Sequence, residues 1–423
     1  MHIAVGSLAP QNGFAAGLAF VEHKNFANEV RTSIDIDALA SSNGSWRAGT
    51  YIKAYRQPGG NTYGAAPLLN LYSQSISLSR VDFYGLGPNT IPLAHTTFGF
   101  SENITGANLI LPTSRVLYKK LGLGLLAEIN GRFPSVRAGS DSLLPSIGTL
   151  FTESAAPGLA RQAPFIQASE GIRLVPTFPK DPVRLNYLVQ FQQFIAPGNS
   201  VYSFRRFNAD LSHEIPIYDF FPAKLKSAYY TSRASVIQYQ GPDDCTAANA
   251  GRNIPLQRAA SADAKDRDAR PCPIISTTRQ LEGSVTLRAF ISESFANRGN
   301  FVPFYFSPTM GGSDINGTAM LSSYPDYRFR GPDLILFRGT VEHSLGKLPL
   351  GTIFSIDEGK IATRRDDVNF DHLRHTFGAG LTIHAGGLPV ISLVFAWGGH
   401  EGTHTTANVS PTLLGGSSRP SLF

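Results

Sequence analysis

The sequence predicts an all-β fold, a transmembrane antiparallel β-barrel that occupies residues 1–423 as a single domain. Three observations predict it: segments with a period of two recur along the chain, no convincing amphipathic helix stands out, and only 16% of the residues are charged. Many alternating segments of roughly ten residues, separated by turn residues, are typical of a transmembrane β-barrel. A large soluble β-sandwich or propeller is the alternative, although no blade-length repeat is visible.

The alternation is clearest in residues 377–385, where Phe377, Leu381 and Ile383 alternate with Gly378, Gly380, Thr382 and His384. Residues 185–192 and 207–212 repeat the pattern. Successive side chains of a strand point to opposite faces, so each segment predicts a strand with one apolar and one polar face. No apolar run is long enough to cross a membrane as a helix.

Strands fit the chain in order from a short first strand at residues 3–8. The others are expected near residues 13–23, 28–39, 45–56, 68–81, 93–110, 117–133, 164–175, 184–195, 202–217, 279–294, 334–346, 351–362, 373–386, 389–398 and 404–414. This makes about sixteen, an even number, as a closed antiparallel barrel requires. Residues 223–240 could hide a further strand, which would change the side of the membrane assigned to each loop.

Residues 218–278 form a polar insertion that contains the only two cysteines, Cys245 and Cys272. A cysteine pair in an otherwise cysteine-free chain predicts a disulfide in an oxidising compartment. Two free thiols or a metal pair are the alternatives, and the metal needs further ligands at suitable spacing. The clustered aspartates lack the spacing of a calcium loop, so we interpret them as a solvated charged segment.

Residues 302–333 form a stretch that is too long for an ordinary loop and too rich in aromatic residues for a linker. Loops longer than about 12–15 residues inside a compact domain are usually functional or disordered. Its aromatic content is typical of a packed loop; the aromatic side chains are Phe304, Tyr305, Phe306, Tyr324, Tyr327 and Phe329.

Several motifs occur in a characteristic order: GGSDINGTAMLSSYPDYRFRG (311–331), LILFRGTVEHSL (334–345) and TIFSIDEGKIA (352–362). FYGLGPNT, LPSIGTLF, AAPGL, YSFRRFNADL and AWGGHEG agree with them. This chain resembles the BamA-like bacterial surface-antigen superfamily of outer-membrane barrels over nearly its whole length. The resemblance implies a sixth extracellular loop folded into the lumen, led by a glycine pair and tipped by an Arg-Gly-aromatic motif.

The resemblance assigns candidate site residues. The glycine pair is Gly311 and Gly312, and the barrel-wall partners are Glu342, Asp357 and Gly359. The remaining loop-motif residues are Ser322, Ser323, Tyr324, Tyr327, Arg328, Phe329 and Arg330.

Two departures from the family pattern matter. The tip arginine is replaced by Ser322, which removes a charge-assisted hydrogen bond to a wall carboxylate. We therefore expect Arg328 or Arg330 to take its place against Asp357 or Glu342. The second departure is the start of the chain, MHIAVGSLAPQNG, which has neither the basic n-region nor the apolar h-region of the signal peptide that family members usually carry before their periplasmic POTRA repeats. Either upstream sequence has been removed or lost, or the protein is a barrel-only relative.

Enzymatic and metal chemistry are not indicated. No G-x-S-x-G elbow occurs, and the pairs His372/His375 and His400/His404 fall at predicted strand ends and turns, where helical metal-site spacing does not bring side chains together. We therefore expect no catalytic residue, metal or cofactor.

The net charge of +6 comes mostly from arginine residues spread along strands and loops, which fits lumen lining or lipopolysaccharide contact at least as well as binding of nucleic acid.

Three functions remain. The first is a BamA-like assembly or translocation barrel that opens between its first and last strands, where Pro10, Gly13 and Pro411 would weaken pairing or simply serve as turn residues. The second is a scaffold subunit of a larger outer-membrane complex. The third is a passive pore or a barrel enzyme such as a lipase.

The expected partners are outer-membrane lipid and lipopolysaccharide, and either client outer-membrane proteins or periplasmic and lipoprotein subunits. Nucleic acid is not expected as a partner. The expected location is the Gram-negative outer membrane.

Overall fold

The computed structural model describes residues 1–26, 30–56, 68–113, 121–139, 141, 143–176, 178, 182–220, 235–239, 276–345, 348–385, 388–399 and 401–409. Cys245, Cys272, Pro411 and nearly all of the polar insertion at residues 218–278 lie outside these ranges, and so does the predicted disulfide.

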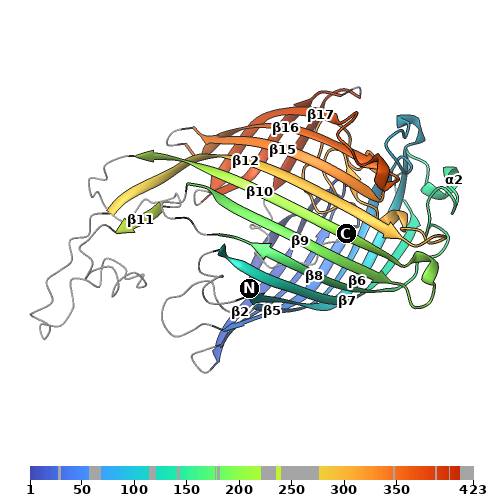
Figure 1. The fold of residues 1–423 in the computed structure, drawn as a ribbon, viewed down its shortest axis with the longest axis horizontal. Helices are drawn as coiled ribbons and strands as arrows, with labels where there is room; N and C mark the ends of the chain where they lie inside the picture. Colours follow the sequence, from blue (N-terminus) through green and yellow to red (C-terminus); the bar gives the residue numbers. More distant parts are fainter. Residues whose placement is uncertain are drawn as a thin grey trace, which may run out of the picture.

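The described residues form one large antiparallel sheet that curls into a barrel (Figure 1). Its strands are β1 (His2–Ser7), β2 (Phe14–Phe26), β3 (Val30–Ser41), β4 (Trp46–Arg56), β5 (Leu68–Phe83), β6 (Thr96–Pro112), β7 (Leu123–Ala138), β8 (Phe165–Leu174), β9 (Arg184–Ile195), β10 (Phe204–Phe220), β12 (Ser276–Ala296), β15 (Asp333–Ser344), β16 (Leu350–Ala362), β17 (Arg374–Ala385), β18 (Leu388–Trp397) and β19 (His404–Val409).

These strands pair in chain order from β1 to β19, so the predicted antiparallel barrel of about sixteen strands is confirmed. A further short strand, β11 (Ser235–Tyr239), pairs with β12 and falls in the segment where one more strand was considered. Within the described residues, no helix is long and apolar enough to cross a membrane.

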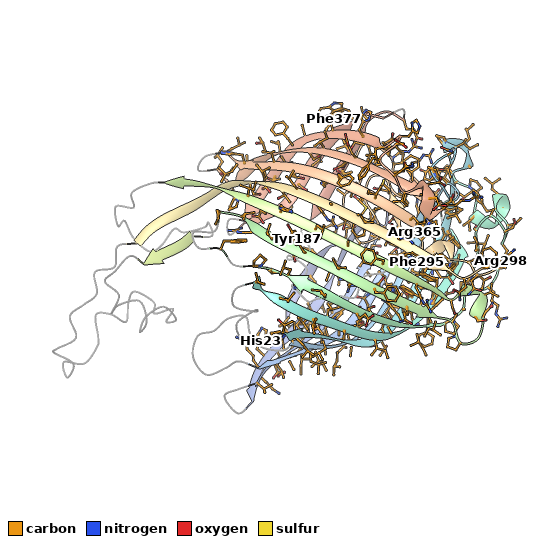
Figure 2. All side chains as sticks on the ribbon, in the orientation of Figure 1. His23, Tyr187, Phe295, Arg298, Arg365 and Phe377 are labelled. Atoms are coloured by element: carbon orange, nitrogen blue, oxygen red, sulfur yellow. The ribbon has the colours of Figure 1, made fainter. Side chains whose placement is uncertain are left out.

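The wall has the predicted two faces. On β17, Phe377, Leu381 and Ile383 are exposed on the outside, whereas Thr376 and Thr382 are buried on the inside. Outward side chains cover the barrel surface (Figure 2). Inward positions of other strands hold buried polar side chains such as Gln74 and Gln192. An apolar exterior and a polar interior are what a barrel in lipid requires.

The connections differ between the two ends of the barrel. One end carries α2 (Ile147–Leu150) and short 3₁₀ turns: η1 (Pro92–Ala94), η2 (Ser200–Tyr202), η4 (Phe304–Phe306) and η5 (Arg365–Asp367). We call this the loop end. It includes residues 297–332, which join β12 to β15 and contain the two-stranded pair β13 (Thr309–Met310) and β14 (Phe329–Arg330). We call residues 297–332 the lumen loop.

The first and last strands, which we call the seam, are both short. β1 pairs with residues 14–19 of β2, and β19 pairs with residues 391–396 of β18. Between the described residues of β1 and β19 there is no ladder of backbone hydrogen bonds.

Candidate functional site

The lumen loop lies inside the barrel because it contacts wall residues on several sides. Phe304, Tyr305 and Phe306 are completely buried. The Phe304 ring lies 5.3 Å from the ring of Phe83 on β5, and the Phe306 ring lies 5.5 Å from that of Phe194 on β9. Aromatic rings at these separations attract one another beyond simple burial. The loop is therefore anchored by its aromatic residues, as the sequence predicted.

A second apolar cluster joins the loop to the strands on the other side of it. Its loop members are Met310, Met320, Leu321, Tyr324 and Phe329, and its wall members are Leu334, Leu336 and Ile361 of β15 and β16. The loop is thus packed against both halves of the barrel wall.

The glycine pair allows the loop to fold back on itself. Gly311 and Gly312 have φ angles of 114° and 58°, which favour glycine. A Cβ atom on Gly312 would lie 2.3 Å from Oδ1 of Asp326, and one on Gly311 would lie 2.7 Å from Cβ of Arg328. On the wall, a Cβ atom on Gly359 would lie 2.8 Å from Cε of Met310. Each of these glycines permits a contact that a side chain would block.

Ser322, which the sequence motifs aligned with a tip arginine, reaches the wall carboxylate Asp357. The Ser322 backbone N–H and hydroxyl both donate to Oδ2 of Asp357, each at 3.3 Å. Thr376 donates to the same oxygen at 3.2 Å. The balancing charge comes from Arg338, which pairs opposite Asp357 in the β15–β16 register and lies 3.3 Å from its Oδ1. Asp357 is fully buried, so this cation matters.

Arg328 and Arg330 do not take the expected place against Asp357 or Glu342, and this expectation is corrected. Arg328 instead donates to both carboxylate oxygens of Glu401, at 2.5 and 2.7 Å. Arg330 donates to the Phe304 carbonyl at 3.0 Å. Glu342 accepts a hydrogen bond from Thr382. The physical reason is that Arg338 already neutralises Asp357 within the wall, which leaves no need for a loop arginine there.

Arg328 also joins the loop to the connection between β5 and β6. Its guanidinium also donates to the hydroxyl and carbonyl of Thr90, at 2.6 and 2.7 Å, and lies 4.9 Å from the ring centre of Tyr84. The Arg374 guanidinium lies over the Phe329 ring, 4.3 Å from the ring centre. Bidentate pairs between arginine and carboxylate are among the strong hydrogen bonds of proteins. This contact ties the loop to the turn between β18 and β19.

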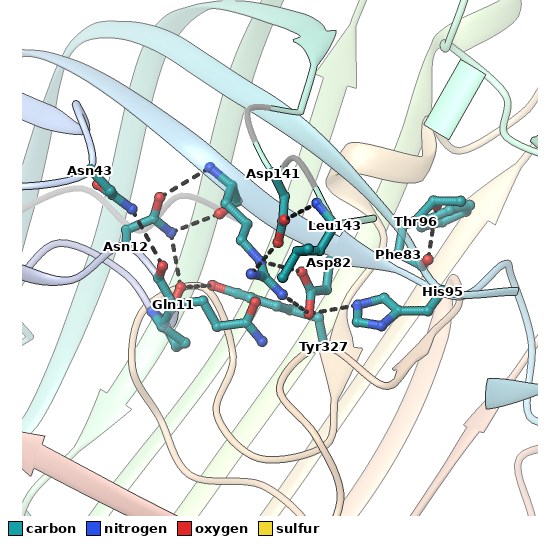
Figure 3. Close-up of polar contacts among 12 residues, drawn as sticks. Gln11, Asn12, Asn43, Asp82, Phe83, His95, Thr96, Asp141, Leu143 and Tyr327 are labelled. Carbon is teal, nitrogen blue, oxygen red and sulfur yellow. Dashed lines mark hydrogen bonds and ion pairs between the residues drawn. The ribbon is translucent and has the colours of Figure 1, made fainter. Parts of the chain in front are cut away.

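The same segment of the loop reaches the turn between β1 and β2. The Tyr327 hydroxyl donates to the Pro10 carbonyl at 3.3 Å. Next to Pro10 lies a network that links Asn12, Arg80, Asp82 and His95 (Figure 3). Ser323 donates to the Gly398 carbonyl at 2.7 Å. The lumen loop therefore contacts the turns that flank both seam strands.

A cavity of about 1340 Å³ remains inside the barrel, and both seam strands and the loop line it. Its polar lining includes Gln74, Asn130, Gln190, Asn208, Asp314 and His404. Burial raises the pKa of Asp314 to about 6, although the backbone N–H groups of Thr318 and Asn316 donate to it. Within the described residues, no group of three or more histidine, cysteine, aspartate or glutamate side chains could hold a metal ion.

Sequence reasoning missed three residues of this site: Glu401, Arg338 and Asn12. Glu401 lies in the AWGGHEG motif, which was used only for the resemblance. Arg338 lies opposite Asp357 only in the observed β15–β16 register, which the sequence does not specify. No sequence signal distinguished Asn12 from an ordinary turn asparagine.

No protein-family model and no curated protein sequence matches this chain. Among solved structures, it is similar to CdiB from Escherichia coli, with a TM-score of 0.52, 11% identity, and coverage of 96% of this chain and 60% of that chain. BamA from Haemophilus ducreyi lacking POTRA domains 1–3 gives a TM-score of 0.49, 9% identity, and coverage of 96% and 69%. CdiB from Acinetobacter baumannii gives 0.48, 9%, and coverage of 96% and 58%.

The likeness to the Escherichia coli CdiB shows the fold. The antiparallel β-barrel expected from the sequence is thereby confirmed at the level of the fold. This chain spans about three fifths of the length of each CdiB chain that it matches.

Proposed function

We propose that this chain is a BamA-like barrel of the Gram-negative outer membrane that assists insertion or translocation of other outer-membrane proteins, without enzymatic chemistry. The observation that carries the proposal is the seam: β1 and β19 are short, and their described residues share no ladder of hydrogen bonds. A strand edge without a partner is a template for an incoming strand.

The edge of β2 supports the same proposal. Among the described residues, β1 pairs only with residues 14–19 of β2, and residues 20–26 pair with β3 alone. Glu22, His23 and Lys24 lie on this edge, and Lys24 pairs with Glu22 at 3.1 Å. Charged side chains on an edge limit indiscriminate pairing. The edge is thus suited to a transient partner strand rather than to aggregation.

A client-folding assay tests the proposal. The purified barrel is placed in vesicles of outer-membrane-type lipid, and a urea-unfolded eight-stranded outer-membrane barrel is added as the client. We expect the client to fold faster than in empty vesicles, seen as its heat-modifiable band on a gel. Vesicles that contain a porin of similar size are the control. Equal client folding in both vesicle types would contradict an assembly function and favour the scaffold alternative.

The packed lumen separates this function from that of a passive pore. Phe304, Tyr305 and Phe306 are completely buried in the lumen, so the loop obstructs the path through the barrel. We expect small, flickering conductance in planar bilayers. A large and steady conductance would instead support the pore alternative.

Lipid and lipopolysaccharide are the proposed surroundings of the outer wall. Arg365, with a side chain 69% exposed, pairs with Glu293 at 3.3 Å and lies 5.3 Å from the ring centre of Phe295 on the wall near the loop end (Figure 2). A cation beside an aromatic ring at that position suits a lipid phosphate. Arg365→Glu should reduce the lipopolysaccharide retained during purification, and unchanged retention would argue against this contact.

A further inference from the structure

Acidic and amide side chains line the cavity from two sources, the barrel wall and the lumen loop. Glu128 and Asn130 of β7 and Asn108 of β6 line it from the wall, and Asp314 lines it from the loop. Alternation along β7 directs Glu128 and Asn130 inward, because Ile129 between them is exposed on the outside. The cavity, at about 1340 Å³, has room for a small organic molecule.

The charges of the cavity are not balanced. Each arginine of the lining has its own carboxylate: Arg47 pairs with Asp37 at 3.4 Å, Arg132 with Glu102 at 2.8 Å and Arg288 with Asp210 at 2.8 Å. The other carboxylates of the lining, Glu128, Asp314 and Asp326, form no ion pair with a lysine or arginine of the described ranges. His404 is the one further basic side chain of the described lining. The unmatched charge of the cavity is therefore negative.

The hydrogen bonds around Glu128 leave an amide oxygen without a donor. The Tyr72 hydroxyl donates its single proton to Oε1 of Glu128 at 2.5 Å, so the hydroxyl oxygen can only accept from Asn130. Asn130 therefore turns its Nδ2 toward Tyr72, at 3.2 Å, and its Oδ1 has no hydrogen-bond partner. Asn130 is only 5% exposed, and a buried oxygen without a donor is costly.

Asn108 adds a second amide oxygen of the same kind. It lies opposite Glu128 in the β6–β7 register, and its Oδ1 also has no hydrogen-bond partner. Glu128, Asn108 and Asn130 thus offer one carboxylate and two amide oxygens, all of them acceptors. A primary ammonium group carries three N–H donors and no acceptor, so it complements these three side chains in both charge and hydrogen bonding.

We propose that the cavity binds a polyamine. One of its primary ammonium groups is held by Glu128 together with Asn108 and Asn130, and another is matched by the Asp314 carboxylate of the lumen loop. A divalent metal ion fits this lining less well, since no group of three or more potential metal-ligand side chains occurs in the described part of the chain. The site goes beyond the proposed function, because it requires neither a client nor the seam.

Spermidine binding to the whole barrel tests the proposal. The barrel is placed in nanodiscs of zwitterionic lipid, which carries no net charge to attract a polyamine, and radiolabelled spermidine is measured by equilibrium dialysis near neutral pH. Empty nanodiscs give the background. We expect saturable binding at one site per barrel. Binding that does not exceed the background, or that does not saturate, would overturn the proposal.

Variants on the wall identify the first ammonium site. Glu128→Gln keeps an acceptor for Tyr72 but removes the charge, and should weaken spermidine binding about tenfold or more. Asn108→Ala removes one carbonyl oxygen from a half-buried side chain and should weaken it about threefold, which provides a second test if Glu128→Gln lacks the heat-modifiable folded band. Glu214→Gln, in a wall ion pair with Arg184 outside the cavity, is the matched control and should bind as the parent does. Unchanged affinity in the Glu128 and Asn108 variants would overturn the assignment.

A monoamine separates the two ends of the site. Asp314→Asn should weaken spermidine binding about tenfold but leave displacement of spermidine by propylamine at the Glu128 end unchanged. Spermidine affinity that is the same with and without the Asp314 carboxylate would overturn the two-ended arrangement. Potassium ions that displace spermidine as well as propylamine does, at equal concentration, would assign the cavity to inorganic cations and overturn the proposal.

Discussion

Replacing Arg328 with methionine tests whether charge holds the lumen loop in the barrel. The Arg328 side chain is 1% exposed and makes four hydrogen bonds, two to Glu401 and two to Thr90. Methionine keeps the apolar stem but leaves the Glu401 carboxylate without this cation. Removing one partner of a buried ion pair costs about 3–5 kcal/mol. Because the Glu401 side chain is 21% exposed, water compensates in part, and we expect a loss of about 2–4 kcal/mol.

The free energy of unfolding can be measured in detergent micelles with guanidinium, followed by the fluorescence of Trp46 and Trp397. Arg184→Met is the matched control, since its pair with Glu214 has side chains 39% and 33% exposed. Exposed ion pairs contribute about 0–1 kcal/mol. Equal losses in the two variants would refute the reasoning that burial makes the Arg328 pair strong.

A double-mutant cycle isolates the pair itself. Glu401→Gln alone keeps a hydrogen-bond acceptor and should cost less than Arg328→Met. If the two side chains stabilise the barrel through each other, the combined loss will be smaller than the sum by about 0.5–3 kcal/mol. Strict additivity would show that Arg328 acts mainly through Thr90.

Three further predictions follow from the loop and its anchors. Gly312→Ala should leave little folded barrel and should lower the temperature at which half of the folded, heat-modifiable gel band is lost, because the added Cβ atom would lie 2.3 Å from Oδ1 of Asp326. An unchanged temperature would contradict this. Asn12→Ala removes four hydrogen bonds and should cost about 2–4 kcal/mol in guanidinium unfolding, and a loss under about 1 kcal/mol would show that water replaces them. The pKa of Asp314 is raised from 3.8 to about 6, so its protonated form favours folding: stability present below pH 4 should be lost as pH rises through about 6. Asp314→Asn should remove this dependence, and an identical pH profile in the variant would contradict it.

The fold could be predicted from the sequence because most strands show their own alternation of apolar and polar residues. Alternation in β17 places Leu381 outside and Thr382 inside, and the same local rule applies on every wall strand with a clear pattern. The additional strand β11 was harder to predict, since it lies in a segment with mixed composition and pairs with β12 alone. Strand ends also shifted by a few residues, as at β7, where backbone pairing continues to Ala138.

The site was only partly predictable. The buried loop and its glycine pair could be anticipated from motifs and aromatic content. Asp357 was expected to meet Arg328 or Arg330, whereas Ser322 and Arg338 reach it. The partner of Arg328 could not be anticipated, because Glu401 is 73 residues away in sequence and meets it only where the loop folds into the lumen against the β18–β19 turn. Arg338 was overlooked for a different reason: its role depends on strand register, which local spacing does not specify.

The pairing of Asp357 with Arg338 changes what would happen if the loop tip left the wall. If a loop-tip arginine supplied the only cation, its departure would leave a buried carboxylate without a partner, at a cost of about 3–5 kcal/mol. Here the cation belongs to the wall, and at Asp357 itself the departure of Ser322 would break only hydrogen bonds, worth about 1 kcal/mol each. The barrel thus carries its counter-ion as part of the wall, and the tip is held by hydrogen bonds and by the burial of Leu321 and Tyr324 rather than by an ion pair to Asp357.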